Sequence, residues 1–417
     1  MAGTPLAFNG SGRAPAGAKC EWYRERNFNE IPEQSPHAVT VPGAIDAWCR
    51  LLADHGTKDL YEVLMPAIRL AEHGFRVTPR VAYDWARKVA RLSLDPDTAR
   101  QYIPDGNAPK PGDRFRQPQL AATLRKISRG GCAAFYEGEV AAEIVAKLRS
   151  LGGLHRPEDF AAHAGNYVKP ISALYRGFEI YECPPNGQGL ATLIMLRALS
   201  GYDLSGPGYH EADCIHLLAE VTKAAYGLRD LYFCDPEHHP VKVADFRSDR
   251  QEERIRQSIH PDAALPETGR PEIEHTDTVY VAVVDWDRNA VSLINSLFSS
   301  FGSGLYARKS GVLLHNCGHS FRVCPGHPNA ICTSNAADAH DHSRDDAERG
   351  AGRHAVRHHG RRLPGRGTSA FRIPDSRSRS RPAGGGRGST LLRLRRRPSA
   401  RKDDLRRYRH GACPARP

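Results

Sequence analysis

The sequence predicts an α+β fold in which a mostly helical region is followed by a β-hairpin and then by a basic tail. Three observations support this order. Apolar residues repeat at helical spacing through the first two thirds of the 417 residues. Two β-rich runs then flank a polar turn at 287–289. Beyond residue 330, arginine becomes abundant and the apolar pattern is lost.

The helical pattern starts after residues 41–44 and passes through Trp48 and Leu52. Leu60, Leu64 and Ile68 then repeat every four residues, and a glycine at 74 marks the end of that helix. Further helical patterns, linked by Gly/Pro turns, cover 119–127, 138–151, 189–199 and 210–226.

The two β-rich runs are 278–285 and 290–298. Both contain alternating or continuous β-branched residues, and the polar residues between them are typical of a tight connection. We therefore expect an antiparallel hairpin here.

Composition excludes several classes of protein. An apolar content of 40% is enough for a core, and no run of eighteen apolar residues occurs. The first fifteen residues have neither the basic nor the apolar region of a signal peptide. The ten cysteines have no motif spacing, which is typical of a reducing compartment. These features predict a cytoplasmic protein without a transmembrane segment.

The basic charge is confined to the tail. Residues 331–417 hold 22 Lys+Arg against 8 Asp+Glu, a net charge of +14, so that −2 remains for residues 1–330 of the overall +12. The tail is also rich in Gly, Pro, Ser and His, and it has too little apolar surface to form a core. We expect it to be disordered.

Six sequence motifs carry the most specific information about ancestry. The longest is DTVYVAVVDWDRNAVSLINSLFSSFGSGLYARKSGVLLHN at 277–316. Five more occur upstream: NGSGRAP (9–15), VPGAIDAW (41–48), LMPAIRLAEHGF (64–75), FYEGEVAAEIV (135–145) and YECPPNGQGLATL (181–193). By these motifs, which follow family order, the chain resembles the γ-glutamyltransferase family of N-terminal-nucleophile (Ntn) amidohydrolases, and 277–316 is similar to the opening of the family's small subunit. Several ordered motifs are far more specific than one short pattern.

The resemblance implies a catalytic threonine at Thr278 and autocatalytic cleavage between Asp277 and Thr278. A hydroxyl is a weak nucleophile that needs an adjacent base, and an α-amino group with a pKa of about 7.7–8.0 suits that role. Cleavage frees this amine on the threonine itself. Taken alone, Thr278 would be only a β-branched residue that opens a strand.

Other site residues carry over from the family unevenly. Ser296 matches a hydroxyl residue that supports the nucleophile, although a serine on a strand is often only a packed, hydrogen-bonded group. Ser11 stands where γ-glutamyl enzymes have a carboxylate-binding arginine, and Arg13 follows two residues later. Arg13 is either a carboxylate-binding residue or an ordinary surface arginine.

The amino-acid clamp of the γ-glutamyl enzymes is therefore missing at its usual positions. Cys317 and Ser320 replace the Gln and Asp that bind the α-amino group, and Phe298 replaces an Asn. Together with NGSGRAP and PPNGQG, these changes place the chain near the cephalosporin-acylase-like branch, whose acyl groups need not be glutamyl.

The resemblance also implies an architecture and an assembly. It predicts a four-layer αββα sandwich that is incomplete at both ends. The chain starts after the family's early glycine-rich segment, and the match to the family stops at about Ala330. It divides the chain into a large-subunit region (1–277), the start of a small-subunit region (278–330) and the tail (331–417). After cleavage the two regions form a heterodimer. The implied activity is hydrolysis or transfer of γ-glutamyl groups, as in glutathione, or of related small carboxylated amides, with no metal or organic cofactor.

The resemblance stops after about Ala330, where the family has a stretch like RPxHTIIP and later a Gly-Gly turn after MPFG. Read one nucleotide later, codons for residues 335–345 allow Met-Arg-Pro-Met-His-Thr-Ile-Ile-Pro-Gly. The same shift at 354–362 allows Met-Pro-Phe-Gly-Ile-Met-Gly-Gly. Both fall in one frame and in family order, so we hypothesise a +1 frameshift that replaces the rest of the small subunit. The structural and oxyanion-hole elements that these motifs supply in the family would be lost with it, and one lost oxyanion-hole donor costs about 10²–10³ in rate.

Three other interpretations are open. The chain could be a catalytically inactive remnant of the family, which predicts no cleavage before Thr278. The basic tail could bind nucleic acid, although it lacks interleaved aromatic residues and any reader motif. A zinc site could be drawn from residues whose spacing fits no zinc pattern, namely Cys317, His319, Cys324, His327 and Cys332.

Overall fold

The computed structural model describes residues 5–204, 211–265, 278–332, 355–356 and 370–371. Asp277 and most of the predicted tail lie outside these residues. None of the helices within them is both long and apolar enough to span a membrane.

Helices dominate the described part of the large-subunit region. The first ten are α1 (Cys20–Glu25), α2 (Ala44–His55), α3 (Leu60–His73), α4 (Pro79–Ala86), α5 (Val89–Leu92), α6 (Pro96–Tyr102), α7 (Pro118–Gly130), α8 (Ala133–Tyr136), α9 (Glu139–Ser150) and α10 (Pro157–Ala161). Four more follow: α11 (Gly189–Ser200), α12 (Glu211–Tyr232), α13 (Val243–Phe246) and α14 (Asp249–Ser258). All six helices expected from the apolar pattern are confirmed, and α12 extends beyond its predicted end.

Helix α3 illustrates how the sequence determines helix ends. The Asp59 side chain accepts a hydrogen bond of 2.7 Å from the Glu62 amide and caps the first turn. Gly74 ends the helix with a φ of 82°, in the left-handed region that glycine favours. On the inner face, Ile68 is completely buried.

The strands form two larger sheets and two short pairs. The five-stranded sheet has the order β4 (Asn166–Val168), β1 (Leu6–Asn9), β11 (Ala355–Val356), β8 (Ala290–Ser296) and β7 (Thr278–Val284). The three-stranded sheet has the order β12 (Ala370–Phe371), β6 (Phe178–Glu182) and β5 (Ile171–Tyr175). The short pairs are β2 (Phe75–Arg76) with β3 (Arg114–Phe115), and β9 (Tyr306–Ala307) with β10 (Val312–Leu313).

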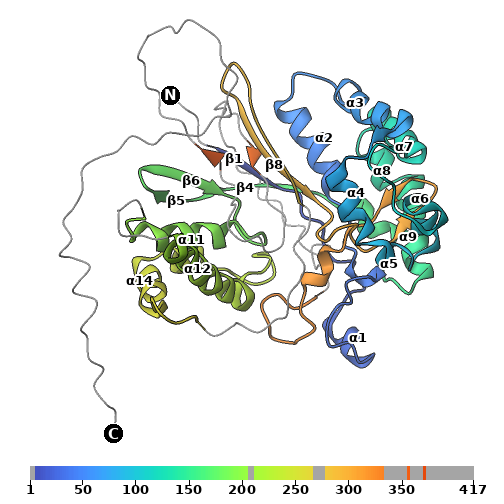
Figure 1. Ribbon diagram of the computed structural model, residues 1–417. Helices are drawn as coiled ribbons and strands as arrows, with labels where there is room; N and C mark the ends of the chain where they lie inside the picture. The colour runs from blue at the N-terminus through green and yellow to red at the C-terminus, as the bar shows by residue number, and fades with distance from the viewer. Residues whose placement is uncertain (1–4, 205–210, 266–277, 333–354, 357–369, 372–417) are drawn as a thin grey trace, which may run out of the picture.

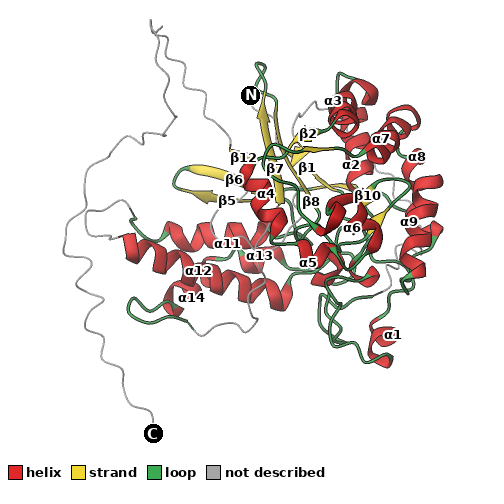
Figure 2. Ribbon diagram, turned by 45° about the vertical axis from the view of Figure 1, so that its right-hand side comes forward, coloured by secondary structure: helices red, strands yellow, loops and turns green. Residues whose placement is uncertain are grey.

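Two helical groups lie on opposite sides of strands β1, β4 and β8 (Figure 1). One contains α2, α3 and α7–α9, and its core includes Ile144 and Leu148. The other contains α11, α12 and α14, with Ile194 and Val221 in its core. The two helical groups are also separated by the strands in the rotated view (Figure 2). The α+β class is therefore confirmed. The four-layer sandwich stays a prediction, because the strand pairings do not establish two facing sheets.

The predicted hairpin is confirmed as β7 and β8, paired antiparallel from Thr278 with Ser296 to Val284 with Ala290. The Asp285 amide donates to the Asn289 carbonyl at 3.0 Å and closes the turn. β7 is an end strand of its sheet, and its apolar residues face largely outward. The exposed large apolar side chains of the hairpin are Val279, Tyr280, Val281, Val283, Val284, Trp286 and Val291.

Candidate active site

The predicted nucleophile lies at the first residue of β7. In the strand register, Thr278 is directly opposite Ser296 of β8. The structure thus brings the two predicted positions together, while Asp277 lies outside the described residues.

Ser296 also stabilises the turn that follows β8. Its Oγ accepts a hydrogen bond of 2.9 Å from the Phe298 amide. Phe298 has a φ of 80°, an unusual value for a bulky residue, and there the chain leaves the strand direction. The strand predicted over 290–298 therefore ends at Ser296. Phe298 lies beyond it and lines a cavity.

A cluster of buried polar residues holds the segment after this turn. Asn316 is completely buried, and its Oδ1 accepts a hydrogen bond of 3.0 Å from the Ser299 amide. Its amide nitrogen lies 3.2 Å from Ser299 Oγ, and Ser299 in turn contacts the Glu33 carboxylate. No local sequence pattern predicts this cluster, because Glu33 is distant in the chain from Ser299 and Asn316.

The cavity beside Phe298 has a volume of about 250 Å³. Its walls come from the end of β1, from the 184–188 loop, from the end of α12 and the loop after it, and from the segment after the hairpin. The predicted substrate-binding residues and the altered clamp positions all line it: Ser11, Arg13, Phe298, Cys317 and Ser320. Residues far apart in the sequence therefore share one cavity.

Arg13 and Ser11 have different roles in this cavity. Arg13 Nη2 forms an ion pair of 2.5 Å with Glu237 Oε2, while Arg13 Nη1 is buried and has no hydrogen-bond partner among the described residues. Ser11 Oγ instead bonds to Asn9 Oδ1 and lies 3.4 Å from Asn186 Oδ1. Of these two side chains, Arg13 is the one with an unused donor.

A second arginine in the cavity wall is neutralised by its neighbours. Arg229 Nη2 lies 2.6 Å from Asp230 Oδ1, and its Nη1 donates to Gln188 Oε1 at 3.2 Å. Its charge is thus committed to a local contact. Arg13 is also paired with a carboxylate, that of Glu237, and its distinguishing feature is the Nη1 group without a partner among the described residues.

His315 is a buried neutral residue that fixes the segment below the cavity. Its Nε2 donates to the Thr40 carbonyl at 2.9 Å, and its Nδ1 accepts from the Cys317 amide at 3.2 Å. Burial lowers the pKa of His315 to about 4. The hydrogen bonds require the neutral form as well, because a protonated Nδ1 could not accept from Cys317.

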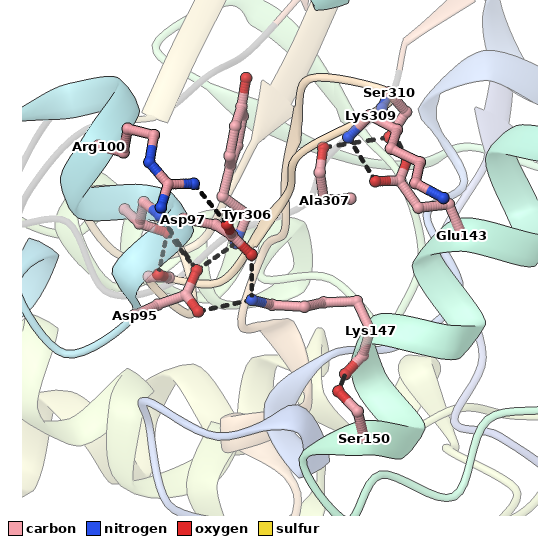
Figure 3. A network of polar contacts seen from close by, with 12 residues as sticks. Asp95, Asp97, Arg100, Glu143, Lys147, Ser150, Tyr306, Ala307, Lys309 and Ser310 are labelled. Atoms are coloured by element: carbon pink, nitrogen blue, oxygen red, sulfur yellow. Dashed lines mark hydrogen bonds and ion pairs between the residues drawn. The ribbon is translucent and has the colours of Figure 1, made fainter.

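An acidic network ties the small-subunit region to α6 and α9 (Figure 3). Asp95 pairs with Lys147 Nζ at 2.6 Å and also accepts from the Tyr306 amide at 3.2 Å. Glu143 accepts from the Ser310 amide at 2.6 Å. These contacts join residues on both sides of Thr278 in the sequence.

The described residues contain no group of three His, Cys, Asp or Glu side chains arranged to hold a metal ion.

Comparison with known proteins identifies the ancestry of this arrangement. Residues 1–342 match the family described as Gamma-glutamyltranspeptidase. The chain belongs to this family.

Relatives within the family include both hydrolases and acylases. The glutathione hydrolase-like YwrD proenzyme of Bacillus subtilis is 35% identical over 325 residues, which cover 78% of this chain and 61% of that protein. The acylase ACY 1 proenzyme of Pseudomonas sp. (strain V22) is 35% identical over 69% of this chain and 52% of its own length. The chain thus spans little more than half the length of these relatives.

Solved structures of the family share the fold. The cephalosporin acylase from Bacillus halodurans has a TM-score of 0.72 at 36% identity, covering 79% of this chain and 61% of its own. The γ-glutamyltranspeptidase of Helicobacter pylori has a TM-score of 0.58 at 28% identity, covering 63% and 77%. The resemblance inferred from the motifs is confirmed.

Proposed function

We propose that the chain derives from a self-processing amidohydrolase that forms an acyl ester on Thr278 and acts on small carboxylated amides, γ-glutamyl compounds among them. The observation that carries this proposal is the position of Thr278. It opens β7 opposite Ser296, and the turn after Ser296 leads directly to the cavity that contains Arg13.

Processing and catalysis use the same hydroxyl. The Thr278 Oγ attacks the Asp277 carbonyl, the peptide C–N bond breaks, and water hydrolyses the resulting ester to free the Thr278 amine. This amine then takes the hydroxyl proton while Oγ attacks a substrate amide. Water or an acceptor amine releases the acyl group. No cofactor enters this chemistry, and we expect a cytoplasmic heterodimer of the two processed regions.

The buried donor on Arg13 supports a carboxylate at the far end of the acyl group. Arg13 lines the cavity, and its buried Nη1 has no hydrogen-bond partner among the described residues, while Glu237 occupies Nη2. A guanidinium binds a carboxylate well, because its fixed donors match the carboxylate oxygens.

Cleavage is tested on freshly purified protein by a denaturing gel and intact mass. Wild type should yield fragments 1–277 and 278–417, and Thr278→Ala should remain one chain. Thr276→Ala is the matched control, since it removes a hydroxyl near the bond but keeps the nucleophile. If wild type is cleaved, amides with and without a terminal carboxylate then test Arg13→Ala, which should weaken use of the carboxylated amide alone.

The second candidate is an inactive, frameshifted remnant of such an enzyme. The exposed apolar side chains of β7 favour it, because a working nucleophile strand requires a covered, water-poor site. So does the family sequence that appears when the codons after Ala330 are read one nucleotide later.

Deleting one nucleotide between codons 330 and 335 distinguishes the candidates. Under the remnant interpretation, the frame-restored protein is cleaved before Thr278 and the present chain is not. Equal cleavage of both proteins would refute the remnant interpretation. No cleavage in either would count against Thr278 as a self-processing nucleophile.

A further inference from the structure

Two cysteines of the helical region lie together, away from the cavity. Cys49 is on α2, and Cys132 is the residue before α8. Cys132 Sγ lies 3.8 Å from the carbonyl oxygen of Ile45. In an α-helix this oxygen faces the amide four residues on, which here is that of Cys49. The Cys132 thiol is therefore placed at the same helical turn as Cys49.

The two thiols are chemically unequal. Hydrogen bonding between the two thiols lowers the pKa of Cys49 and raises the pKa of Cys132. The nearby Asp46 carboxylate raises the pKa of both, and Arg50 lowers that of Cys132. A thiolate is the reactive form of cysteine, so Cys49 is the nucleophile of the pair.

Access and packing suit a reversible reaction at this position. Both cysteines are only half-buried, so a small oxidant can reach them. Both also pack against the largest hydrophobic core, which holds α2 and α8 in place. We propose that Cys49 and Cys132 form a redox-sensitive dithiol, which a peroxide converts into a disulfide that staples α2 to the start of α8.

The reaction balances with hydrogen peroxide as the oxidant. The Cys49 thiolate attacks one peroxide oxygen, the O–O bond breaks, and the leaving hydroxide takes a proton to become water. The Cys132 sulfur then attacks the Cys49 sulfenic acid, the S–O bond breaks, and the second water leaves with the Cys132 proton. Two thiols are oxidised by two electrons, and one peroxide is reduced to two waters.

The disulfide would close a long segment of chain, from residue 49 to residue 132. Closing such a loop restricts the unfolded state, so oxidation should raise the unfolding temperature by about 5 °C. Dithiothreitol should reverse the shift.

Peptide mapping of the full chain tests this directly. Tryptic peptides 27–50 and 130–147 each contain one cysteine, so a crosslink between them is unambiguous. After equimolar hydrogen peroxide and alkylation, we expect loss of both free thiols and a linked 27–50/130–147 peptide that dithiothreitol separates. Cys214, another half-buried cysteine, should remain alkylated and serves as the internal control.

Two variants complete the test. In Cys132→Ser, Cys49 should be trapped as a sulfenic acid by dimedone, with no crosslink and no thermal shift, whereas Cys214→Ser should behave like wild type. The proposal is overturned if wild-type Cys49 and Cys132 stay separately alkylated after peroxide, or if Cys49 links to another cysteine. The stapling role is overturned if the crosslink forms fully without raising the unfolding temperature. The peptide map of the wild-type protein tests whether the crosslink forms, even if a variant does not fold.

Discussion

The α2–α9 helical region and the β7–β8 hairpin are both rich in apolar residues, but the helical region buries far more of them. Ile144 and Leu148 are completely buried, whereas Val279 and Val284 are each 62% exposed. Each amphipathic helix covers its neighbour's apolar face, so the helical region supplies its own core. An end strand has one edge and two faces to cover, and the described residues leave much of β7 uncovered.

The largest difference in stability should appear when a buried side chain of the helical region and an exposed side chain of the hairpin are each truncated to alanine. Leu148→Ala removes a fully buried side chain and should lower the free energy of unfolding by about 4 kcal/mol. Val283→Ala, at a side chain 53% exposed, should cost less than about 0.5 kcal/mol. Urea denaturation measures both. Equal losses would show that the hairpin is buried in solution.

Two buried histidines, His155 and His315, lie outside the hairpin, which itself contains none. A pH series therefore sharpens the comparison. Burial lowers the pKa of His155 and of His315 from 6.5 to about 4. The unfolded chain therefore binds these protons first, so the stabilisation present above pH 6.5 is lost as the pH falls towards 4. Each histidine should cost on the order of 3 kcal/mol at pH 4 relative to pH 7.

His315→Gln tests this assignment. Its unfolding free energy should fall less steeply between neutral and acidic pH than that of wild type, measured by denaturant titration at each pH. An unchanged pH dependence would mean that His315 binds its proton at the same pH in the folded and in the unfolded protein.

The acidic network that connects the helical region to the segment after the hairpin should have a smaller effect. The Lys147 side chain is 16% exposed and that of Asp95 is 5% exposed, so Lys147→Met leaves a buried carboxylate without its cation. We expect a loss of about 2 kcal/mol, since Asp95 keeps its hydrogen bond from the Tyr306 amide. Arg80→Met is the control: its partner is Asp84, but the Arg80 side chain is 79% exposed, and the loss should stay below about 0.5 kcal/mol. Similar losses in the two variants would contradict the buried character of the network.

The smallest effect on stability is expected within the hairpin itself. Val281→Lys places a charge on an exposed strand and should change the unfolding free energy by no more than about 0.5 kcal/mol. It should nevertheless raise the soluble fraction and reduce light scattering, because charges on an end strand oppose edge-to-edge association. A large loss of stability would mean that this face is covered in solution.

Elements with a strong local pattern could be predicted from the sequence. The repeat through Leu60 and Ile68 gave α3, and the two β-branched runs gave the hairpin that pairs Thr278 with Ser296. Strand β1 was not predicted, because four residues carry too little periodicity and its partners are remote in the chain.

The site was predictable only where a motif marked it. NGSGRAP indicated Arg13, but the contact with Glu237 joins positions far apart in the sequence. The same holds for the bond from Asn316 to Ser299, and for Phe298, whose positive φ follows from the turn rather than from its residue type. Such contacts depend on how distant segments pack, which no local pattern records.

The network around Asp95 has a consequence for the chain once it is cut. Asp95, Glu143 and Lys147 precede Thr278, while the amides of Tyr306 and Ser310 follow it, and Leu305 is buried in the same core as Leu148. These contacts do not depend on the covalent connection before Thr278, so after the proposed cleavage they would hold the two pieces together. Scission of that connection would expose a new amino terminus without letting either piece diffuse away.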